Sequence, residues 1–163
     1  MKASIENQKG LTLIELILVI GILMVLLSMA FVSISNIRVI STNSNTSTVI
    51  ASDLKNQQIR AMVGDTEGRG VPDNYGVKIL STQYVLFHGV SYNSSDTTNY
   101  AIPVSTGYTL SSTFANDTVL FASESGELVN YVQNQDTIIL TNTTSGQTKT
   151  IRLNKYGTIT SIN

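Results

Sequence analysis

The sequence predicts an α+β protein, in which a long N-terminal helix precedes an antiparallel β-sheet domain. Two observations carry this prediction. A long apolar run occupies residues 11–32, with helical spacing of apolar residues further along the chain. After Gly64 the chain consists of short segments of β-branched, aromatic and other apolar residues, separated by turns that contain glycine.

The first part of the helix is apolar enough to cross a membrane. Residues 16–32 carry no charge, and only Gly21 and Ser28 interrupt the apolar side chains. Together with the apolar residues just before it, the run reaches the roughly 20 residues that span about 30 Å of hydrocarbon. Lys2 and Lys9 precede it and favour a cytoplasmic N-terminus. We therefore expect a transmembrane helix over residues 11–35, with the following domain outside the cytoplasm.

One carboxylate, Glu15, lies near the start of this run. A charge at the centre of a membrane helix costs roughly 2.5–3.5 kcal/mol on insertion scales. A cleaved secretory signal is one interpretation, with Ser28–Ala30 as the cleavage site and Phe31 as the new N-terminus, but such signals usually have only 7–15 apolar residues. A plain membrane anchor is the second, and it leaves Glu15 unexplained. A processed signal that keeps its helix is the third.

The third interpretation rests on the stretch "KGLTLIEL", which resembles the prepilin signal of type IV pilins and of the pseudopilins of type II secretion. The resemblance implies that a prepilin peptidase cleaves the Gly10–Leu11 bond, which removes residues 1–10 as a leader, and methylates the amine of Leu11. It also implies that Glu15 of an incoming subunit pairs with the Leu11 amine of its neighbour during assembly. The family most often has Phe where this chain has Leu11.

The resemblance therefore implies a non-enzymatic structural subunit of a type IV pilus or a type II secretion-like filament. Its expected partners are prepilin peptidase, other pilin or pseudopilin subunits, the inner-membrane assembly platform and, before assembly, membrane lipid. The expected location is the cytoplasmic membrane, with a single pass and the N-terminus inside, followed by a surface or periplasmic filament. An alternative from another class is a membrane-anchored surface protein whose β domain binds a ligand.

Residues 36–63 are predicted to continue the helix and to pack it on the sheet. Ser41–Thr48 contains only poor helix formers, so we expect a kink or a melted turn there. Gly64 is the predicted end of the helix. The apolar stripe expected to face the sheet comprises Ile50, Leu54, Ile59, Met62 and Val63.

The exported β domain is expected over residues 64–163. Tyr75–Leu80 and Gln83–His88 predict a hairpin, and Tyr84–Phe87 predicts a central strand because it is apolar on both faces. Further strands are expected within residues 108–114, 118–123, 137–142, 150–153 and 158–162.

A second, looser resemblance concerns the middle of the chain. In H-type minor pseudopilins and related minor pilins, a "Q-x-R-A" helix end precedes a "Y-G-V" strand and a "Y-x-x-F" strand. Gln58–Ala61, Tyr75–Val77 and Tyr84–Phe87 match these patterns. The resemblance implies a minor pilin or pseudopilin.

No catalytic, cofactor-binding or metal site is predicted. Cysteine is absent, and His88, the only histidine, is expected to be a partly buried structural residue. Asp65, Glu67 and Asp73 share one loop that could gather oxygen ligands for calcium, but their spacing misses the EF-hand pattern, so a solvated loop is expected. The 10 basic and 11 acidic residues nearly cancel, which argues against direct nucleic-acid binding.

Overall fold

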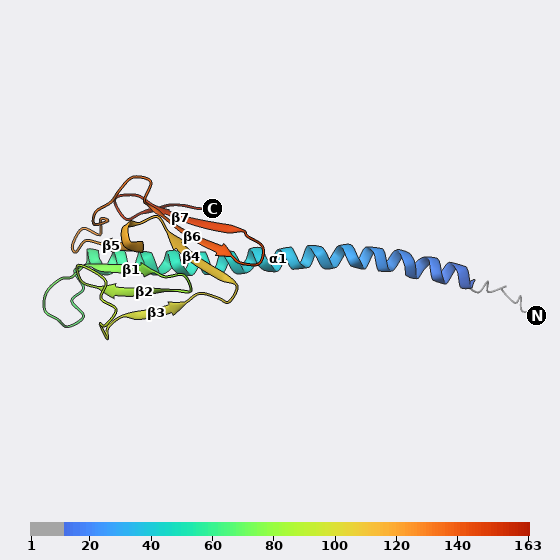
Figure 1. The fold of residues 1–163 in the computed structure, drawn as a ribbon, viewed down its shortest axis with the longest axis horizontal. Helices are drawn as coiled ribbons and strands as arrows, with labels where there is room; N and C mark the ends of the chain where they lie inside the picture. Colours follow the sequence, from blue (N-terminus) through green and yellow to red (C-terminus); the bar gives the residue numbers. More distant parts are fainter. Residues whose placement is uncertain (1–11) are drawn as a thin grey trace, which may run out of the picture. The chain divides into compact units, whose positions relative to one another are not determined.

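A single long helix, α1 (Leu13–Met62), precedes eight β-strands in the computed structural model of the chain (Figure 1). The structure describes residues 12–163, except for the side chains of residues 29–45. The chain divides into two compact units, Met1–Ser41 and Thr42–Asn163. The predicted α+β class is confirmed, whereas the predicted leader, residues 1–10, lies outside the described residues.

In the first unit, every described side chain from Thr12 to Ser28 is exposed. Among the residues that the structure describes, no helix meets the length and apolarity required to cross a membrane. The predicted transmembrane segment, residues 11–35, includes Leu11 and the side chains of residues 29–35, which lie outside the described residues.

The helical backbone of α1 is continuous through residues 41–48, so the predicted melted turn is wrong. Each poor helix former costs at most about 0.7 kcal/mol relative to alanine, and tertiary packing readily outweighs that. Ser47, near the end of this stretch, is already buried within the second unit. The boundary between the two compact units nevertheless falls inside this stretch, at Ser41 and Thr42.

Helix α1 ends where the sequence predicts. Gly64 has a φ of 63°, and its N–H donates to the carbonyl of Ala61 at 3.1 Å. The N–H of Asp65 donates to the carbonyl of Arg60 at 3.0 Å. These two bonds form a Schellman motif, in which a left-handed glycine satisfies the last carbonyls of the helix.

The buried face of α1 differs in part from the predicted stripe. Ile50 and Leu54 are buried as expected, but Ile59, Met62 and Val63 are 45–71% exposed. Gln57 and Gln58, which the predicted stripe did not include, are buried instead, and the amide of Gln58 donates to backbone carbonyls at this end of the helix. The buried residues on α1 are Ser47, Ile50, Ala51, Leu54, Gln57, Gln58 and Ala61.

The first sheet has the strand order β3-β2-β1-β5, and all its pairs are antiparallel. The predicted hairpin is confirmed, and β2 is a central strand because it lies between β1 and β3. The sequence analysis missed β3, a short edge strand whose side chains are mostly exposed. The strands are β1 (Tyr75–Ile79), β2 (Gln83–His88), β3 (Tyr100–Pro103) and β5 (Thr118–Phe121).

The second sheet has the order β4-β6-β7-β8 and is also antiparallel. The domain thus contains two sheets. The pattern of strands in the sequence did not show whether they form one sheet or two. A 3₁₀ turn, η1 (Ala115–Asp117), precedes β5. The strands are β4 (Tyr108–Ser112), β6 (Thr137–Asn142), β7 (Thr148–Leu153) and β8 (Ile159–Ile162).

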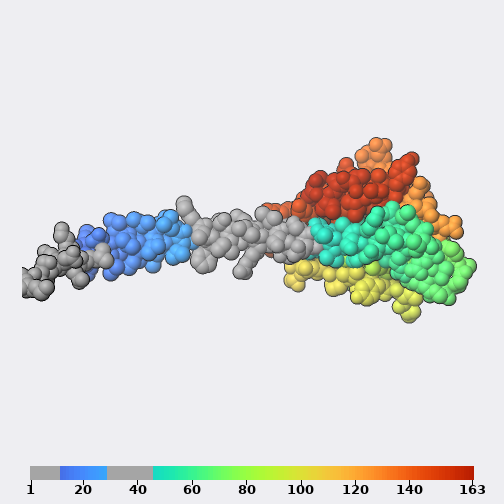
Figure 2. All heavy atoms as spheres, turned by 180° about the vertical axis from the view of Figure 1, so that it is seen from behind, coloured from blue at the N-terminus to red at the C-terminus, as the bar shows by residue number. Residues whose placement is uncertain are grey.

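Both sheets and the second half of α1 contribute to one apolar core. Figure 2 shows this half of the helix between the strands of the first sheet and those of the second. The most buried residues of this core come from α1, β1, β2, β5, β6 and β7. They include Ile50, Leu54, Tyr75, Val77, Tyr84, Val119, Phe121, Ile138, Leu140, Ile151 and Leu153.

Gln58 ties α1 to turns from both halves of the β domain. Its Nε2 donates to the carbonyl of Gly126 at 3.1 Å and to that of Tyr156 at 2.7 Å. The turn at Gly157 must approach so closely that a Cβ there would lie 2.6 Å from Nε2 of Gln58. Gly157 also has a φ of 73°, which favours glycine. The turn therefore requires glycine for two separate reasons.

We expect Gln58→Leu to lower the free energy of unfolding by about 1–3 kcal/mol, because one buried and one partly buried carbonyl lose their donor. Chemical denaturation followed by circular dichroism measures the loss. Asn56→Leu, at an exposed position on the same helix, is the matched control and should change stability much less. Equal losses in the two variants would show that the two bonds do not hold the helix to the turns.

Candidate functional site

The N-terminal end of α1 is capped by its own sequence. Thr12 directly precedes the helix, and its Oγ1 accepts a hydrogen bond from the N–H of Glu15 at 3.3 Å. Thr-x-x-Glu is the spacing of a capping box. A carboxylate in the first turn also interacts favourably with the positive end of the helix dipole. The sequence analysis assigned no role to Thr12, although the spacing was readable.

Glu15 lies in this first turn with its side chain exposed. None of the described residues forms an ion pair with it. Gly10 and Leu11, the residues of the predicted cleavage and methylation site, lie outside the described residues. The pairing predicted between Glu15 and the amine of Leu11 therefore stays a prediction.

The part of α1 around and after Glu15 presents an apolar surface. Its large apolar side chains from Leu13 to Leu27 are 45–76% exposed. Ser28 adds no unpaired hydroxyl donor to this surface, because its Oγ donates to the carbonyl of Val25 at 2.7 Å. A continuous apolar surface of this kind marks a site of contact with protein or membrane.

The acidic loop after α1 uses its carboxylates in ion pairs. Asp65 lies 2.8 Å from Nε of Arg60, and Glu67 contacts both Arg60 and Arg69. Asp73 pairs with the ring of His88 at 2.9 Å. Among the described residues, no group of three or more histidine or acidic side chains is placed to hold a metal ion. The carboxylates considered for calcium are thus engaged by the side chains of Arg60, Arg69 and His88.

His88 is partly buried, as predicted, with 15% of its side chain exposed. Its Nδ1 lies 2.9 Å from Asp73, and its Nε2 lies 2.8 Å from the hydroxyl of Thr98. Hydrogen bonds from the hydroxyl and N–H of Thr98 lower the pKa of Asp96, next to this ring. Both nitrogens of the His88 ring thus have a hydrogen-bond partner. Through them His88 links Asp73, in the loop after α1, to Thr98, in the connection after β2.

The three motifs of the looser resemblance meet at the end of α1. The guanidinium of Arg60 lies 4.4 Å from the centre of the Tyr75 ring, and the Tyr75 hydroxyl donates to the carbonyl of Asp65 at 2.9 Å. Gly76 leaves room for Phe87, since a Cβ there would lie 2.5 Å from its ring. These motif residues dock the helix, β1 and β2 together.

Tyr84, from the third of these motifs, is 2% exposed and donates its hydroxyl proton to Asp53 at 2.5 Å. Burial, followed by this hydrogen bond and the charge of Asp53, raises the pKa of Tyr84 well above its ordinary value. The bond links β2 to α1.

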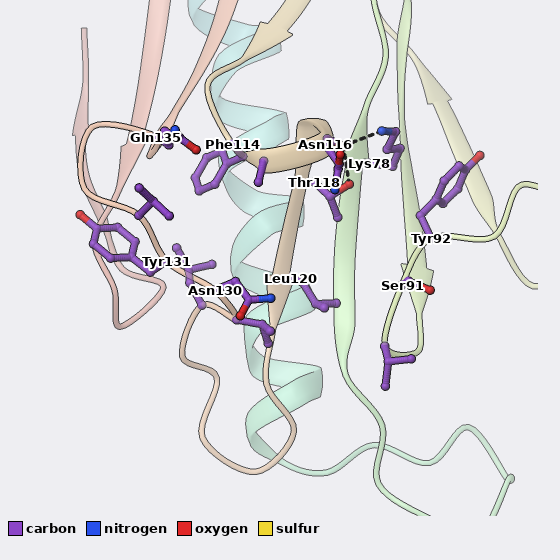
Figure 3. A pocket seen from close by; sticks show the side chains of 15 residues that line it. Lys78, Ser91, Tyr92, Phe114, Asn116, Thr118, Leu120, Asn130, Tyr131 and Gln135 are labelled. Atoms are coloured by element: carbon purple, nitrogen blue, oxygen red, sulfur yellow. Dashed lines mark hydrogen bonds between the residues drawn. The ribbon is translucent and has the colours of Figure 1, made fainter.

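A pocket of about 380 Å³ lies beside β5, the edge strand of the first sheet (Figure 3). Lys78, Thr118 and Leu120 face it from β1 and β5. Val77 and Val119, adjacent to them on the same strands, are buried in the core. The sequence analysis did not find this pocket, because loops distant in sequence form its walls. Those loops contribute residues 90–92, 114–116, 128–132 and 135.

The N-terminal part of the chain matches a known family model. Residues 6–31 match the prokaryotic N-terminal methylation motif, a prepilin-type signal. The match confirms the resemblance of the N-terminal stretch to a prepilin signal and is consistent with the type IV pilin and pseudopilin family. Neither the curated proteins nor the solved structures contain a significant match to the chain.

The raised pKa of Tyr84 predicts a loss of stability in alkali. The unfolded phenol ionises near pH 10 and the folded one only at higher pH, so the stabilising contribution is complete below about pH 10 and decreases above it. We expect the unfolding free energy of wild type to fall more steeply above pH 10 than that of Tyr84→Phe. Denaturation curves from pH 8 to about pH 11 measure this. Parallel decreases would contradict the prediction.

Proposed function

We propose that the chain is a non-enzymatic structural subunit, a minor pilin or pseudopilin, of a type IV pilus or a type II secretion-like filament. The observation that carries the proposal is the methylation motif at residues 6–31, with Glu15 in the first turn of an apolar helix. A cytoplasmic-membrane intermediate with its N-terminus inside would precede assembly. Prepilin peptidase, the inner-membrane platform and other subunits would act on it in turn.

The chemistry of assembly follows from one cleavage. Hydrolysis of the Gly10–Leu11 bond creates a positive amine at Leu11, one residue before the capping residue Thr12. In an apolar filament core, an unpaired Glu15 carboxylate is costly, and the amine of a neighbouring subunit would neutralise it. The exposed apolar side chains of α1 would supply most of the packing. Glu15 would then set the axial register.

The assignment to a minor rather than a bulk subunit is the finer part of the proposal. It is supported by the matches at Gln58–Ala61, Tyr75–Val77 and Tyr84–Phe87, which share one docking site in the fold. The presence of Glu15 argues against the special tip subunit that lacks this glutamate in the family.

Cleavage is tested by the mature N-terminus. We expect mass spectrometry of the membrane-extracted protein to find Leu11 first, with a methylated amine, and Gly10→Val to block this processing without preventing membrane insertion. A chain that begins at Met1 would instead support the membrane-anchored surface protein, and one that begins at Phe31 a secretory signal. A Gly10→Val variant whose mature chain still began at Leu11 would remove the main support for prepilin processing.

Assembly is tested by Glu15→Gln, which removes the charge and nearly preserves the shape. Leader removal should proceed, but entry into filaments should fall sharply, because losing one partner of a buried ion pair costs about 3–5 kcal/mol. Cofractionation with sheared filaments at matched expression measures incorporation. Glu127→Gln, an identical change at an exposed position of the β domain, is the control. Wild-type incorporation of Glu15→Gln would show that the carboxylate has no role in assembly.

A further inference from the structure

We propose that the pocket beside β5 binds an uncharged oligosaccharide. The proposal is separate from the filament role, because the pocket lies in the β domain and uses no residue of the N-terminal signal. Its volume of about 380 Å³ is within the range of roughly 300–1,000 Å³ that is usual for small-molecule sites.

The charge of the lining excludes several ligand classes. No aspartate or glutamate lines the pocket, so a cation would find no carboxylate there. Lys78 is the one charged residue of the lining, and its Nζ already donates to the carbonyl of Asn116 at 2.6 Å. An anion would have to compete for this ammonium group. The pocket therefore favours a neutral ligand.

The polar groups of the lining suit hydroxyls. The side-chain amides of Asn116, Asn130 and Gln135 make no hydrogen bond to other described residues, although all three line the pocket. Each amide offers two donors and an acceptor. A sugar hydroxyl is also both donor and acceptor, so several such groups on a ring would match amides placed on three sides.

Aromatic side chains supply the complementary apolar surface. Phe114 and Tyr131 are partly buried and lie near Gln135 on one wall of the pocket (Figure 3). Aromatic rings give a large rigid contact area. The hydroxyl of Tyr131 donates to Asp136 at 3.5 Å, so its ring rather than its hydroxyl is the surface offered to a ligand. The C–H face of a pyranose packs on such a ring while its hydroxyls reach the amides at the edge.

The pocket is held in shape without a ligand. The N–H of Val129 donates to the carbonyl of Leu120 at 2.8 Å, which fixes the start of the loop that forms one wall. The carbonyl of Asn116 accepts bonds from both Lys78 and Thr118. Asn116 and Asn130 have left-handed φ values of 51° and 57°, which asparagine adopts more readily than most residues with a side chain. A preformed site lowers the ordering cost of binding.

The test uses the full chain in a detergent without a sugar headgroup. Saturation-transfer-difference NMR is recorded with three neutral probes, namely maltotriose, cellotriose and tri-N-acetylchitotriose. Trigalacturonate and trialanine are the charged and the peptide comparisons. We expect at least one neutral trisaccharide to bind with a dissociation constant of about 1 mM or lower. Binding by none of the three, or stronger binding of either comparison, would overturn the proposal.

The variants remove amides without disturbing the backbone. Asn130→Gly deletes a lining amide while keeping the left-handed conformation, and Gln135→Ala acts at an exposed position. The double variant should weaken binding of the neutral probe by about tenfold or more. Asn134→Gly, also exposed and at a φ of 69° but outside the lining, should bind as wild type does. Unchanged affinity in the double variant would place the sugar elsewhere and refute the assignment.

Discussion

The second unit depends on the two hydrogen bonds from the amide of Gln58, because they meet carbonyls from turns that follow different sheets. The turn at Gly126 follows β5 of the first sheet, whereas Tyr156 lies between β7 and β8 of the second. Few strands of one sheet contact strands of the other, so the two sheets are connected mainly through other elements. The end of α1 is one such element, because it bonds to turns from both sheets. The backbone adds to this support, since the carbonyl of Ala61 accepts the N–H of Glu124 at 2.8 Å.

Local signals predicted the parts of the fold that local chemistry determines. The hairpin of β1 and β2, the strand β6 and the helix end at Gly64 all follow from short patterns of apolar residues and glycine. The errors arose where tertiary contacts decide. Gln57 and Gln58 replace apolar residues on the buried face of α1, and β3 is an exposed edge strand with little apolar alternation.

The candidate sites divide in the same way. Glu15 was found from the sequence because a single charge in an apolar run is conspicuous, and the capping role of Thr12 follows from spacing within four residues. The pocket beside β5 could not be found, because Lys78 and Gln135 come to line the same cavity only through folding. Polar surface residues such as Asn130 carry no pattern that distinguishes a binding wall from an ordinary loop.

The separation of the Gln58 contacts from the loops around β5 has an evolutionary consequence. Most substitutions at residues 90–92 or 130–135 alter no bond of the buried amide, and the glycines at 126 and 157 can stay fixed meanwhile. The β domain can therefore diversify at one edge under selection while its attachment to α1 drifts little. Related chains would then differ first in the loops beside β5 and last at the end of the helix.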